Sequence, residues 1–323
     1  MNVNVRGHGM LRMPDFFIIG AAKSGTTSLH RYLEQHPGVC MAARKESWFF
    51  SSNFSGLGRN DEVNTIQGMI TDIRAYSALF SGARPGQLLG EASPSCLYTH
   101  RTTIGNIRSI YAENQAWRRL RFIIILRNPV DRTWAQYRTH LAWQHEDLPF
   151  EQAIERETIR RRLSHNLNPF YDYVGFGMYA DQVAAYLSAF GRDSVRVFLF
   201  EDLVADPVRL CREVFEFIGV DTEYTPPKLE PRNAGLGESR APWFTRFVRS
   251  SSGFKSACAR VVPLRARDEL KGWLIKTGAR SPKSALGQSS RRKLAAIFAD
   301  DIMRLQQTID RDLVGWLFPP VGP

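Results

Sequence analysis

A lysine, a glycine and several hydroxyl residues follow a short apolar run near the start of the chain. The run FFIIG (residues 16–20) continues as A-A-K-S-G-T-T-S, so that Lys23 stands two residues before Gly25. A helical pattern begins at Ser28. A loop between a buried strand and a helix offers free backbone N–H groups and the positive end of the helix dipole, and Lys23 adds a mobile cation. The segment therefore predicts an anion site, although in the P-loop of nucleoside triphosphatases the lysine follows the second glycine.

A second basic residue follows another apolar run. Residues 122–126 (FIIIL) are followed by Arg127, in the sequence R-N-P-V-D-R. Because ligands of an open parallel sheet bind beyond the carboxyl ends of its strands, Arg127 is expected near the Lys23 loop. Two cationic positions at neighbouring strand ends suit a ligand with two separated phosphate groups. The residues expected to contact that ligand are Lys23, Ser24, Gly25, Thr26, Thr27, Ser28 and Arg127.

The elements that must position these residues form an alternation of strands and helices. Continuous apolar runs, typical of parallel strands covered on both faces, occur at residues 16–20, 87–90, 122–126 and 195–200. Apolar residues at helical spacing occur at residues 28–35, 131–143, 150–162, 179–190, 207–218 and 291–309. Stretches rich in Gly, Ser, Pro and Asn predict loops at residues 51–68, 225–241 and 278–290. The order of elements predicts an α/β domain with a mainly parallel sheet.

Composition limits the class of protein. The chain has 323 residues, of which 43% are hydrophobic and 23% charged, as in ordinary globular proteins. It has no uncharged run of the roughly 20 apolar residues that a membrane span needs, and no apolar signal core precedes the first strand. We therefore expect a soluble, cytoplasmic protein. The cysteines, which show no C-x-x-C spacing and predict neither a zinc site nor a disulfide framework, are Cys40, Cys96, Cys211 and Cys258.

The net charge of +11 lies mostly near the C-terminus. From Ala234 onward the chain has 16 Lys and Arg residues against 7 Asp and Glu residues. Such an excess can indicate nucleic-acid or membrane binding. Here the charges are dispersed rather than packed into a run with interleaved aromatic residues, so a solvated face or one that attracts a small anion is favoured. No nucleic-acid partner is expected.

Several motifs together resemble the sulfotransferase family that uses 3′-phosphoadenosine 5′-phosphosulfate (PAPS). They are G-A-A-K-S-G-T-T-S-L, H-P-G-V, I-L-R-N-P-x-x-R, F-G-M-Y-A-D-Q, V-F-L-F-E-D-L, F-E-F-I-G-V and R-D-L-V-G-W-L. The resemblance implies a P-loop-like, three-layer sandwich in a single domain over residues 1–323. Its core would span about residues 15–220, with a C-terminal loop and helical extension at 221–323.

The resemblance also implies how the donor is held. The Lys23 loop would bind the 5′-phosphosulfate and Arg127 the 3′-phosphate, and no metal would be required. Arg232 and Arg240 would belong to a loop that closes over the nucleotide. The family pattern usually has a serine eight residues after the arginine, but this chain has Ala135 there. A hydroxyl contact to the 3′-phosphate is therefore expected to be missing or replaced.

Sulfuryl transfer requires a general base for the acceptor and a cation for the leaving oxygen. Lys23 can serve as the cation. The segment K-E-S-W-F-F resembles the K-E-x-x-F-F of carbohydrate-type members, which implies that Glu46 is the base. Trp48 departs from the histidine that is often found at its position. Without the resemblance, Glu46 would be interpreted as a surface carboxylate paired with Arg44 or Lys45.

Further residues are expected on the acceptor side of the site. Trp48, with the two phenylalanines that follow it, could give the Glu46 carboxylate an apolar setting. His140 is the alternative base, although packing on the helix surface is the simpler role for it. Glu91 and Tyr179 could line the acceptor site, and Glu91 could equally cap the next turn.

A carboxylate base suggests a sugar or another aliphatic hydroxyl, although an amine and a lipid, peptidic or polyketide acceptor stay open. The expected partner is a small-molecule or glycan acceptor. Two other functions stay open. The first is a P-loop-type kinase or NTPase, which is disfavoured because the loop has no G-K-[ST]. The second is a catalytically silent nucleotide-binding protein, which Ala135 and Trp48 make conceivable. The sequence predicts neither the identity of the acceptor nor an oligomeric state.

Overall fold

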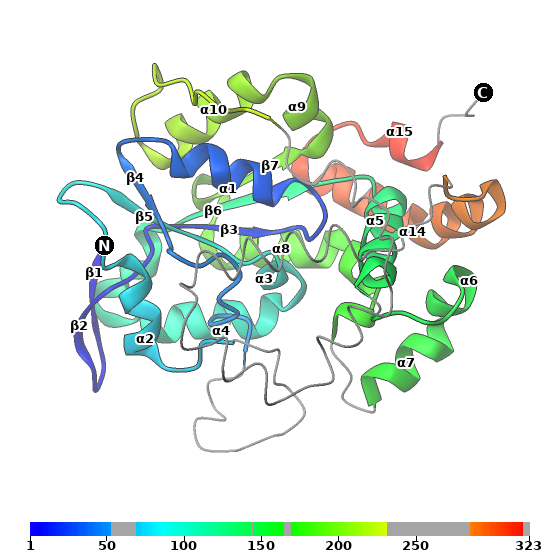
Figure 1. Ribbon diagram of the computed structural model, residues 1–323, viewed down its shortest axis with the longest axis horizontal. Coiled ribbons are helices and arrows are strands. Elements are labelled where there is room, and N and C mark those ends of the chain that lie inside the picture. Colours follow the sequence, from blue (N-terminus) through cyan, green and yellow to red (C-terminus); the bar gives the residue numbers. More distant parts are fainter. Residues whose placement is uncertain (53–68, 144, 165–168, 231–284, 319–323) are drawn as a thin grey trace, which may run out of the picture.

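A five-stranded parallel sheet forms the centre of the molecule (Figure 1). The computed structural model describes residues 1–52, 69–143, 145–164, 169–230 and 285–318. The strands lie in the order β4-β5-β3-β6-β7, and every neighbouring pair is parallel. They are β3 (Phe16–Gly20), β4 (Val39–Met41), β5 (Leu88–Ala92), β6 (Arg121–Leu126) and β7 (Val195–Leu199). A separate antiparallel hairpin comprises β1 (Asn2–Val5) and β2 (Gly9–Arg12).

Helices cover both faces of this sheet and complete three layers. One face packs against α1 (Thr26–Glu34), α9 (Phe200–Ala205) and α10 (Pro207–Ile218). The helices of the other face are α2 (Ile73–Ser77), α3 (Ser95–Tyr98), α4 (His100–Ile110), α5 (Pro129–Ala142), α8 (Tyr179–Phe190) and α14 (Gln288–Ile309). The shorter helices are α6 (Phe150–Ala153), α7 (Arg156–Ser164) and α15 (Val314–Leu317). The predicted α/β sandwich with a parallel sheet is confirmed.

Short 3-10 turns connect several of these elements. They are η2 (Ala78–Phe80), η3 (Glu113–Arg119), η4 (Pro169–Tyr171), η5 (Gly175–Gly177) and η6 (Arg192–Ser194). None of the described helices is long and apolar enough to cross a membrane.

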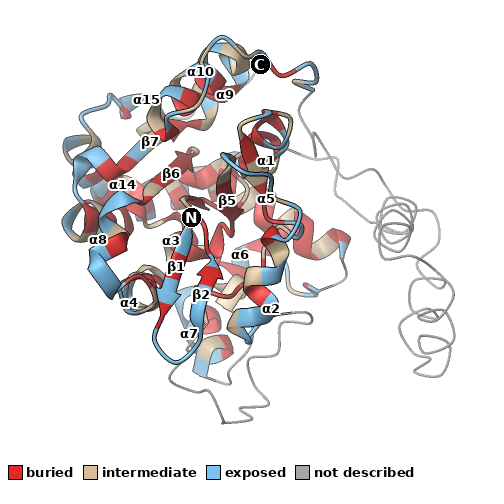
Figure 2. Cartoon of the chain, turned by 90° about the vertical axis from the view of Figure 1, so that its left-hand side faces the viewer, coloured by how far each residue is buried: buried red, intermediate tan, exposed pale blue. Residues whose placement is uncertain are grey.

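The central strands are apolar because both of their faces are covered. All five residues of β3 are buried, and so are five of the six residues of β6 (Figure 2). Phe17 packs with the core that includes α8 and α14, whereas Phe16 and Ile18 pack with α1 and α10. This burial on two faces explains why a continuous apolar run, rather than an alternating one, marked these strands in the sequence.

Some predicted elements differ from the structure. The expected helix at residues 150–162 is wrong, because α6 ends at Ala153 and α7 begins at Arg156. Between them the Glu155 N–H bonds to the Gln152 carbonyl, a tight turn that interrupts the helix. Phe200, expected to end a strand, begins α9 instead. The predicted loops at 51–68, 225–241 and 278–290 lie largely outside the described residues.

The C-terminal helix packs beside the start of α8. The Asp301 carboxylate of α14 accepts hydrogen bonds from the backbone N–H groups of Tyr179 and Ala180, the first at 2.6 Å. These N–H groups belong to the first turn of α8, where an intrahelical partner is lacking. The contact fixes the end of α8 that bears Tyr179 (Figure 1).

Candidate functional site

The loop from β3 to α1 has the form of an anion cradle. Lys23 has a backbone φ of 70° and Gly25 a φ of 90°, and Gly25 is the N-cap of α1. A Cβ at Gly25 would lie 2.6 Å from Cδ2 of Leu203, so this position requires glycine for space as well as for conformation. Because α1 begins directly after it, the free N–H groups of the first turn face the loop.

The ammonium group of Lys23 is buried and interacts with several charged side chains. Burial lowers its pKa to about 8. The negative charge of Glu46 opposes this effect, whereas the positive charges of Lys45, Arg127 and Arg132 add to it. Lys23 thus lies close to two charged residues that the sequence assigned to the site, Arg127 and Glu46. A bound anion would relieve the repulsion among these cations.

Arg127 lies beside the cradle, as its position after β6 predicted. Its Nη1 donates a hydrogen bond of 3.2 Å to the carbonyl oxygen of Lys23. Its guanidinium lies 4.7 Å from the centre of the Phe200 ring. The Tyr179 hydroxyl donates to the Arg127 carbonyl at 3.1 Å and lies beside the buried Ser24. Tyr179 therefore supports the strand end from which Arg127 projects.

Arg132 is a buried cation that the sequence analysis did not assign to the site. Its guanidinium donates hydrogen bonds to the Tyr173 carbonyl, to Thr133 Oγ1 and to Gln136 Oε1. Burial lowers its pKa to about 10, so it keeps its charge near neutral pH. The second arginine of R-N-P-x-x-R was the signal that could have identified it. Its Nη1 and Nη2 donate to protein groups and anchor the segment that contains Tyr173, whereas its buried Nε has no hydrogen-bond partner among the described residues.

Thr133 does not replace the hydroxyl that is missing at Ala135. The Thr133 hydroxyl donates to the Tyr173 carbonyl at 3.1 Å and is fully buried. It is therefore committed to α5 packing rather than to a ligand of Arg127. Arg232 and Arg240 lie outside the described residues, so their predicted contact with the nucleotide stays a prediction.

The segment after β4 carries Glu46 and has two residues in the left-handed backbone region. Glu46 has a φ of 59° and Trp48 a φ of 62°, which are uncommon values for residues other than glycine. The backbone N–H of Glu46 donates to the carbonyl of Ala92, at the end of β5, at 2.9 Å. Left-handed residues of this kind are concentrated at functional sites, where surrounding contacts hold them in place. Lys23 in the cradle is a third example.

The aromatic residues of this segment do not enclose the Glu46 carboxylate. The Glu46 side chain is 46% exposed and pairs with Lys45, as the surface interpretation proposed. The rings of Phe49 and Phe50 are buried instead in the core, where Phe49 stacks on Tyr76 at 4.2 Å between ring centroids. The expected apolar setting of Glu46 is therefore wrong, because nearly half of its side chain is exposed while Phe49 and Phe50 pack in the core.

Glu91 is buried beneath the same segment rather than facing it from solvent. Its Oε1 accepts hydrogen bonds from the hydroxyls of Ser47 (3.1 Å) and Ser93 (2.5 Å). Burial raises the pKa of Glu91 to about 7, although both serines and the charge of Lys45 lower it. Glu91 contacts the loop that holds Glu46. Its expected effect on an acceptor would therefore be indirect, through the position of that loop.

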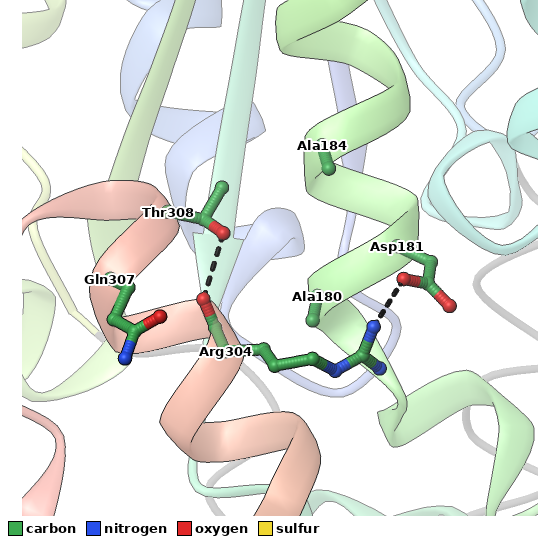
Figure 3. A pocket seen from close by; sticks show the side chains of 6 residues that line it. All are labelled: Ala180, Asp181, Ala184, Arg304, Gln307 and Thr308. Atoms are coloured by element: carbon green, nitrogen blue, oxygen red, sulfur yellow. Dashed lines mark hydrogen bonds and ion pairs between the residues drawn. The ribbon is translucent and has the colours of Figure 1, made fainter.

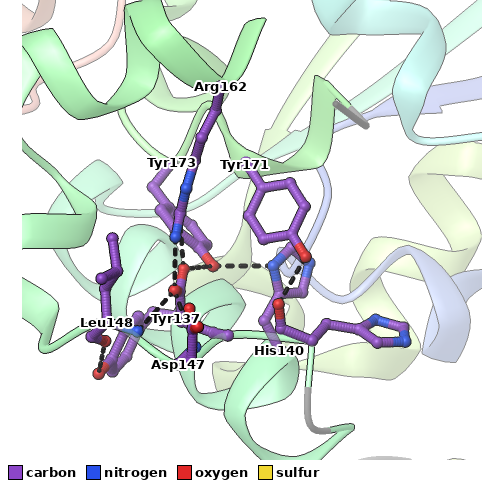
Figure 4. Close-up of polar contacts among 9 residues, drawn as sticks. Tyr137, His140, Asp147, Leu148, Arg162, Tyr171 and Tyr173 are labelled. Atoms are coloured by element: carbon purple, nitrogen blue, oxygen red, sulfur yellow. Dashed lines mark hydrogen bonds and ion pairs between the residues drawn. The ribbon is translucent and has the colours of Figure 1, made fainter. Parts of the chain in front are cut away.

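His140 is 7% exposed and so is not on the helix surface, contrary to expectation. Its Nδ1 lies 2.8 Å from the Tyr173 hydroxyl, and Tyr173 in turn bonds to Glu146 (Figure 4). Burial lowers the pKa of His140 to about 4, and the charge of Lys23 contributes to the decrease. His140 is therefore neutral near pH 7 and lies within electrostatic range of the cradle. Tyr173 and Glu146 carried no sequence motif that could have indicated them.

Trp48 lines the same side of the site. Its ring meets that of Phe170 edge-on, at 4.7 Å between centroids, and Phe170 lies 6.5 Å from the ring of His140. Trp48 and His140, which are far apart in the sequence, thus both lie edge-on beside the ring of Phe170. We refer to Trp48, His140 and Phe170 as the aromatic wall.

A cavity of about 320 Å³ lies elsewhere, between α8 and α14 (Figure 3). An ion pair of 2.6 Å between Asp181 and Arg304 crosses its rim. The lining residues are Ala180, Asp181, Ala184, Arg304, Gln307 and Thr308. None of them is a predicted site residue, so this cavity is separate from the cradle.

Comparison with known proteins identifies the class. The model described as "Sulfotransferase family" matches residues 14–224, and the chain belongs to this family. The membrane-associated sulfotransferase kil1 of Dictyostelium discoideum is 28% identical over 148 residues, which cover 45% of this chain and 27% of that protein. The heparan sulfate glucosamine 3-O-sulfotransferase 3B1 of Mus musculus is 26% identical over 214 residues, which cover 66% and 48%. The chain thus matches about half or less of the length of these relatives.

A solved structure supports the same conclusion. The sulfotransferase from Alicyclobacillus acidocaldarius is 29% identical, with a TM-score of 0.68, and the match covers 94% of this chain and 98% of that one. The likeness therefore extends over nearly the whole chain and includes the cradle, the end of β6 and the segment after β4. The P-loop-like fold expected from the sequence is confirmed.

Proposed function

We propose that the chain transfers a sulfuryl group from PAPS to a hydroxyl of a sugar-containing acceptor. The placement of Lys23 carries this proposal. Arg127 donates to the backbone carbonyl of Lys23, and the negative charge of Glu46 acts on the Lys23 ammonium. A cation close to both an arginine and a carboxylate suits in-line sulfuryl transfer, because such catalysis rests on positioning and on charge stabilisation.

The residues around the loop fit this donor. The cradle at Gly25 and the first turn of α1 suit the 5′-phosphosulfate, since a helix N-terminus binds anions through its free N–H groups. Arg127, at the end of the next strand, suits the 3′-phosphate. A guanidinium can form two parallel hydrogen bonds with phosphate oxygens, which partly offsets the missing hydroxyl at Ala135.

The proposed reaction is an in-line displacement at sulfur. Glu46 accepts the proton of the acceptor hydroxyl while the acceptor oxygen bonds to sulfur. The bond between sulfur and the 5′-phosphate oxygen breaks, and Lys23 stabilises the charge that develops on that oxygen. The products are a sulfate ester and 3′,5′-adenosine bisphosphate. Lys45 holds the Glu46 carboxylate by its ion pair.

The choice of a sugar hydroxyl rests on the relatives and on the base. The mouse relative is named for 3-O-sulfation of heparan sulfate glucosamine. Glu46 lies in a segment similar to that of carbohydrate-type members, and its half-exposed carboxylate is accessible to an acceptor that arrives from solvent.

The test is transfer of radiolabelled sulfate from PAPS to oligosaccharides, with and without EDTA. We expect a labelled sugar product in the parent that survives EDTA and is lost in Lys23→Met. Turnover of ATP with magnesium, and none of PAPS, would select a kinase or NTPase. Binding of the bisphosphate without turnover on any acceptor would select a silent nucleotide-binding protein.

A further inference from the structure

A buried hydrogen-bond network fixes which nitrogen of His140 carries the proton. Glu146 is the centre of the network, and its side chain is fully buried. Arg162 donates to both of its oxygens, at 2.8 and 2.7 Å. The backbone N–H groups of Asp147 and Leu148 each donate to Oε1 at 3.0 Å. Although burial alone would raise the pKa of Glu146, these donors more than offset it, so Glu146 is an ionised acceptor.

The direction of the remaining bonds follows from this charge. The Tyr173 hydroxyl lies 2.7 Å from Glu146 Oε2 and must donate to it, because an ionised carboxylate has no proton to give. Burial raises the pKa of Tyr173, which keeps that hydroxyl protonated. The Tyr173 oxygen is then free to accept, and its neighbour at 2.8 Å is His140 Nδ1. His140 therefore carries its proton on Nδ1.

Neutral histidine has one proton on its ring nitrogens, so Nε2 of His140 carries a lone pair. Nε2 has no hydrogen-bond partner among the described residues. His140 is also within electrostatic range of Lys23, the residue proposed to face the leaving oxygen. It shares the aromatic wall with Trp48, two residues from Glu46.

We propose that His140 Nε2 accepts a hydrogen bond from a neutral hydroxyl or amine of the acceptor, next to the hydroxyl that is sulfated. The inference rests on the proposed function and names a specificity-determining residue for it. A fixed lone pair attracts an O–H or N–H group and repels the oxygens of a sulfate or carboxylate. The acceptor that fits is hence hydroxyl-rich and uncharged at this position. The charged and titratable groups that face His140 are Lys23, His145, Glu146, Arg162, Tyr171 and Tyr173.

A purely structural role for His140 is the competing explanation, and two substitutions separate it from the proposal. His140→Asn places an amide N–H near Nδ1, which keeps the bond to Tyr173 but removes Nε2. His140→Gln places its amide near Nε2 and loses the bond to Tyr173. If Nε2 binds the acceptor, His140→Asn should lower kcat/KM for a neutral chito-oligosaccharide by roughly tenfold or more, mainly through KM, and His140→Gln should retain more activity.

His36→Asn is the matched control. His36 is also buried, and its Nε2 lies 2.9 Å from the Asp221 carbonyl, after the far end of α1. Its substitution should change stability but not the acceptor KM. Nitrogen NMR of labelled histidine, assigned with the variants, should show Nε2 of His140 unprotonated at neutral pH in the parent. A protonated Nε2 would overturn the proposal.

The probes are the chito-oligosaccharide and a heparin oligosaccharide of equal length, and binding of the bisphosphate is measured in parallel. Two results would overturn the role of His140 but leave the proposed function standing. The first is an acceptor KM in His140→Asn equal to that of the parent. The second is equal use of the two sugars by parent and variant. A parent that binds no bisphosphate and transfers no sulfate would overturn the proposed function as well. The two failures are thus distinguished by the behaviour of the parent.

Discussion

The hydroxyl of Ser47 donates a hydrogen bond of 3.1 Å to Oε1 of Glu91, and this contact joins the segment that carries Glu46 to the end of β5. Ser93 donates to the same oxygen, whereas Oε2 of Glu91 has no hydrogen-bond partner among the described residues. A proton on Oε2 would remove the buried charge, and Oε1 would still accept hydrogen bonds from both serines. Glu91 thus holds the segment that carries Glu46 against the end of β5, and it does so best when its carboxyl group is neutral.

The stability of the fold should therefore depend on pH through Glu91. Its pKa is raised from an ordinary 4.5 to about 7, so the folded protein binds a proton that the unfolded chain releases. The stability that it contributes is complete below pH 4.5 and is lost as the pH rises through 7, by roughly 3 kcal/mol. Glu91→Gln mimics the neutral form and should unfold at higher urea than the parent at pH 8, with a smaller difference at pH 5. Glu34→Gln, an exposed carboxylate, is the control; an unchanged pH dependence in Glu91→Gln would contradict the assignment.

Nucleotide binding should be coupled to the proton on Lys23. In the free protein the pKa of Lys23 is about 8, and a bound bisphosphate should raise it by favouring the ammonium. Binding near pH 8 should therefore take up a proton, and affinity should fall as the pH rises above 8. Calorimetry in buffers of different ionisation enthalpy measures this uptake. Lys23→Met should abolish it and lower kcat by about a hundredfold or more; the same uptake in Lys23→Met would show that another group titrates.

Arg127→Ala should weaken discrimination between nucleotides more than it weakens the fold. We expect the preference for 3′,5′-adenosine bisphosphate over 5′-AMP to decrease by about tenfold or more, since a charge-assisted hydrogen bond is lost. Competition binding with both nucleotides measures the ratio. Arg121→Ala, at the opposite end of β6, is the control and should keep the parent preference. If Arg127→Ala retained that preference too, the 3′-phosphate would be held elsewhere.

Glu46→Gln should separate binding from turnover. The amide keeps the shape of the side chain but cannot accept the proton, so kcat should fall by roughly a hundred- to ten-thousandfold while affinity for the bisphosphate is kept. Single-turnover transfer from labelled PAPS is the measurement. Glu34→Gln, which breaks an exposed ion pair with Arg31, should leave kcat unchanged. Parent-like turnover in Glu46→Gln would remove Glu46 from the role of base.

The sequence predicted best those elements whose ends carry local signals. The helix at 207–218 was predicted to the residue, because the Asp206 side chain caps it and Gly219, with a φ of 79°, ends it. The N-terminal hairpin was missed although N-V-N-V alternates buried and exposed residues. The helix predicted at 150–162 was wrong because Phe150, Ile154 and Ile159 continue the apolar spacing across the break.

The site was predictable only where a motif held its residues together. The Lys23 loop and Arg127 follow adjacent strands, so topology alone brought them together. The bonds from Tyr173 and Arg162 to Glu146 join residues 27 and 16 positions apart, and no local pattern encodes them. The exposed Glu46 paired with Lys45 agrees with the interpretation made without the resemblance, whereas the left-handed backbone angles of Glu46 and Trp48 had no sequence signal.

The edge position of β4 has a consequence for how this protein can diversify. β3, which leads to the cradle, is paired on both sides, whereas among the described residues β4 pairs with β5 alone. A change in length after β3 would disturb two neighbours, but the segment after β4 can be replaced at little cost to the sheet, as loops generally tolerate insertion. The half of the site proposed to hold the nucleotide therefore tolerates little change in length, whereas the half proposed to meet the acceptor can be exchanged.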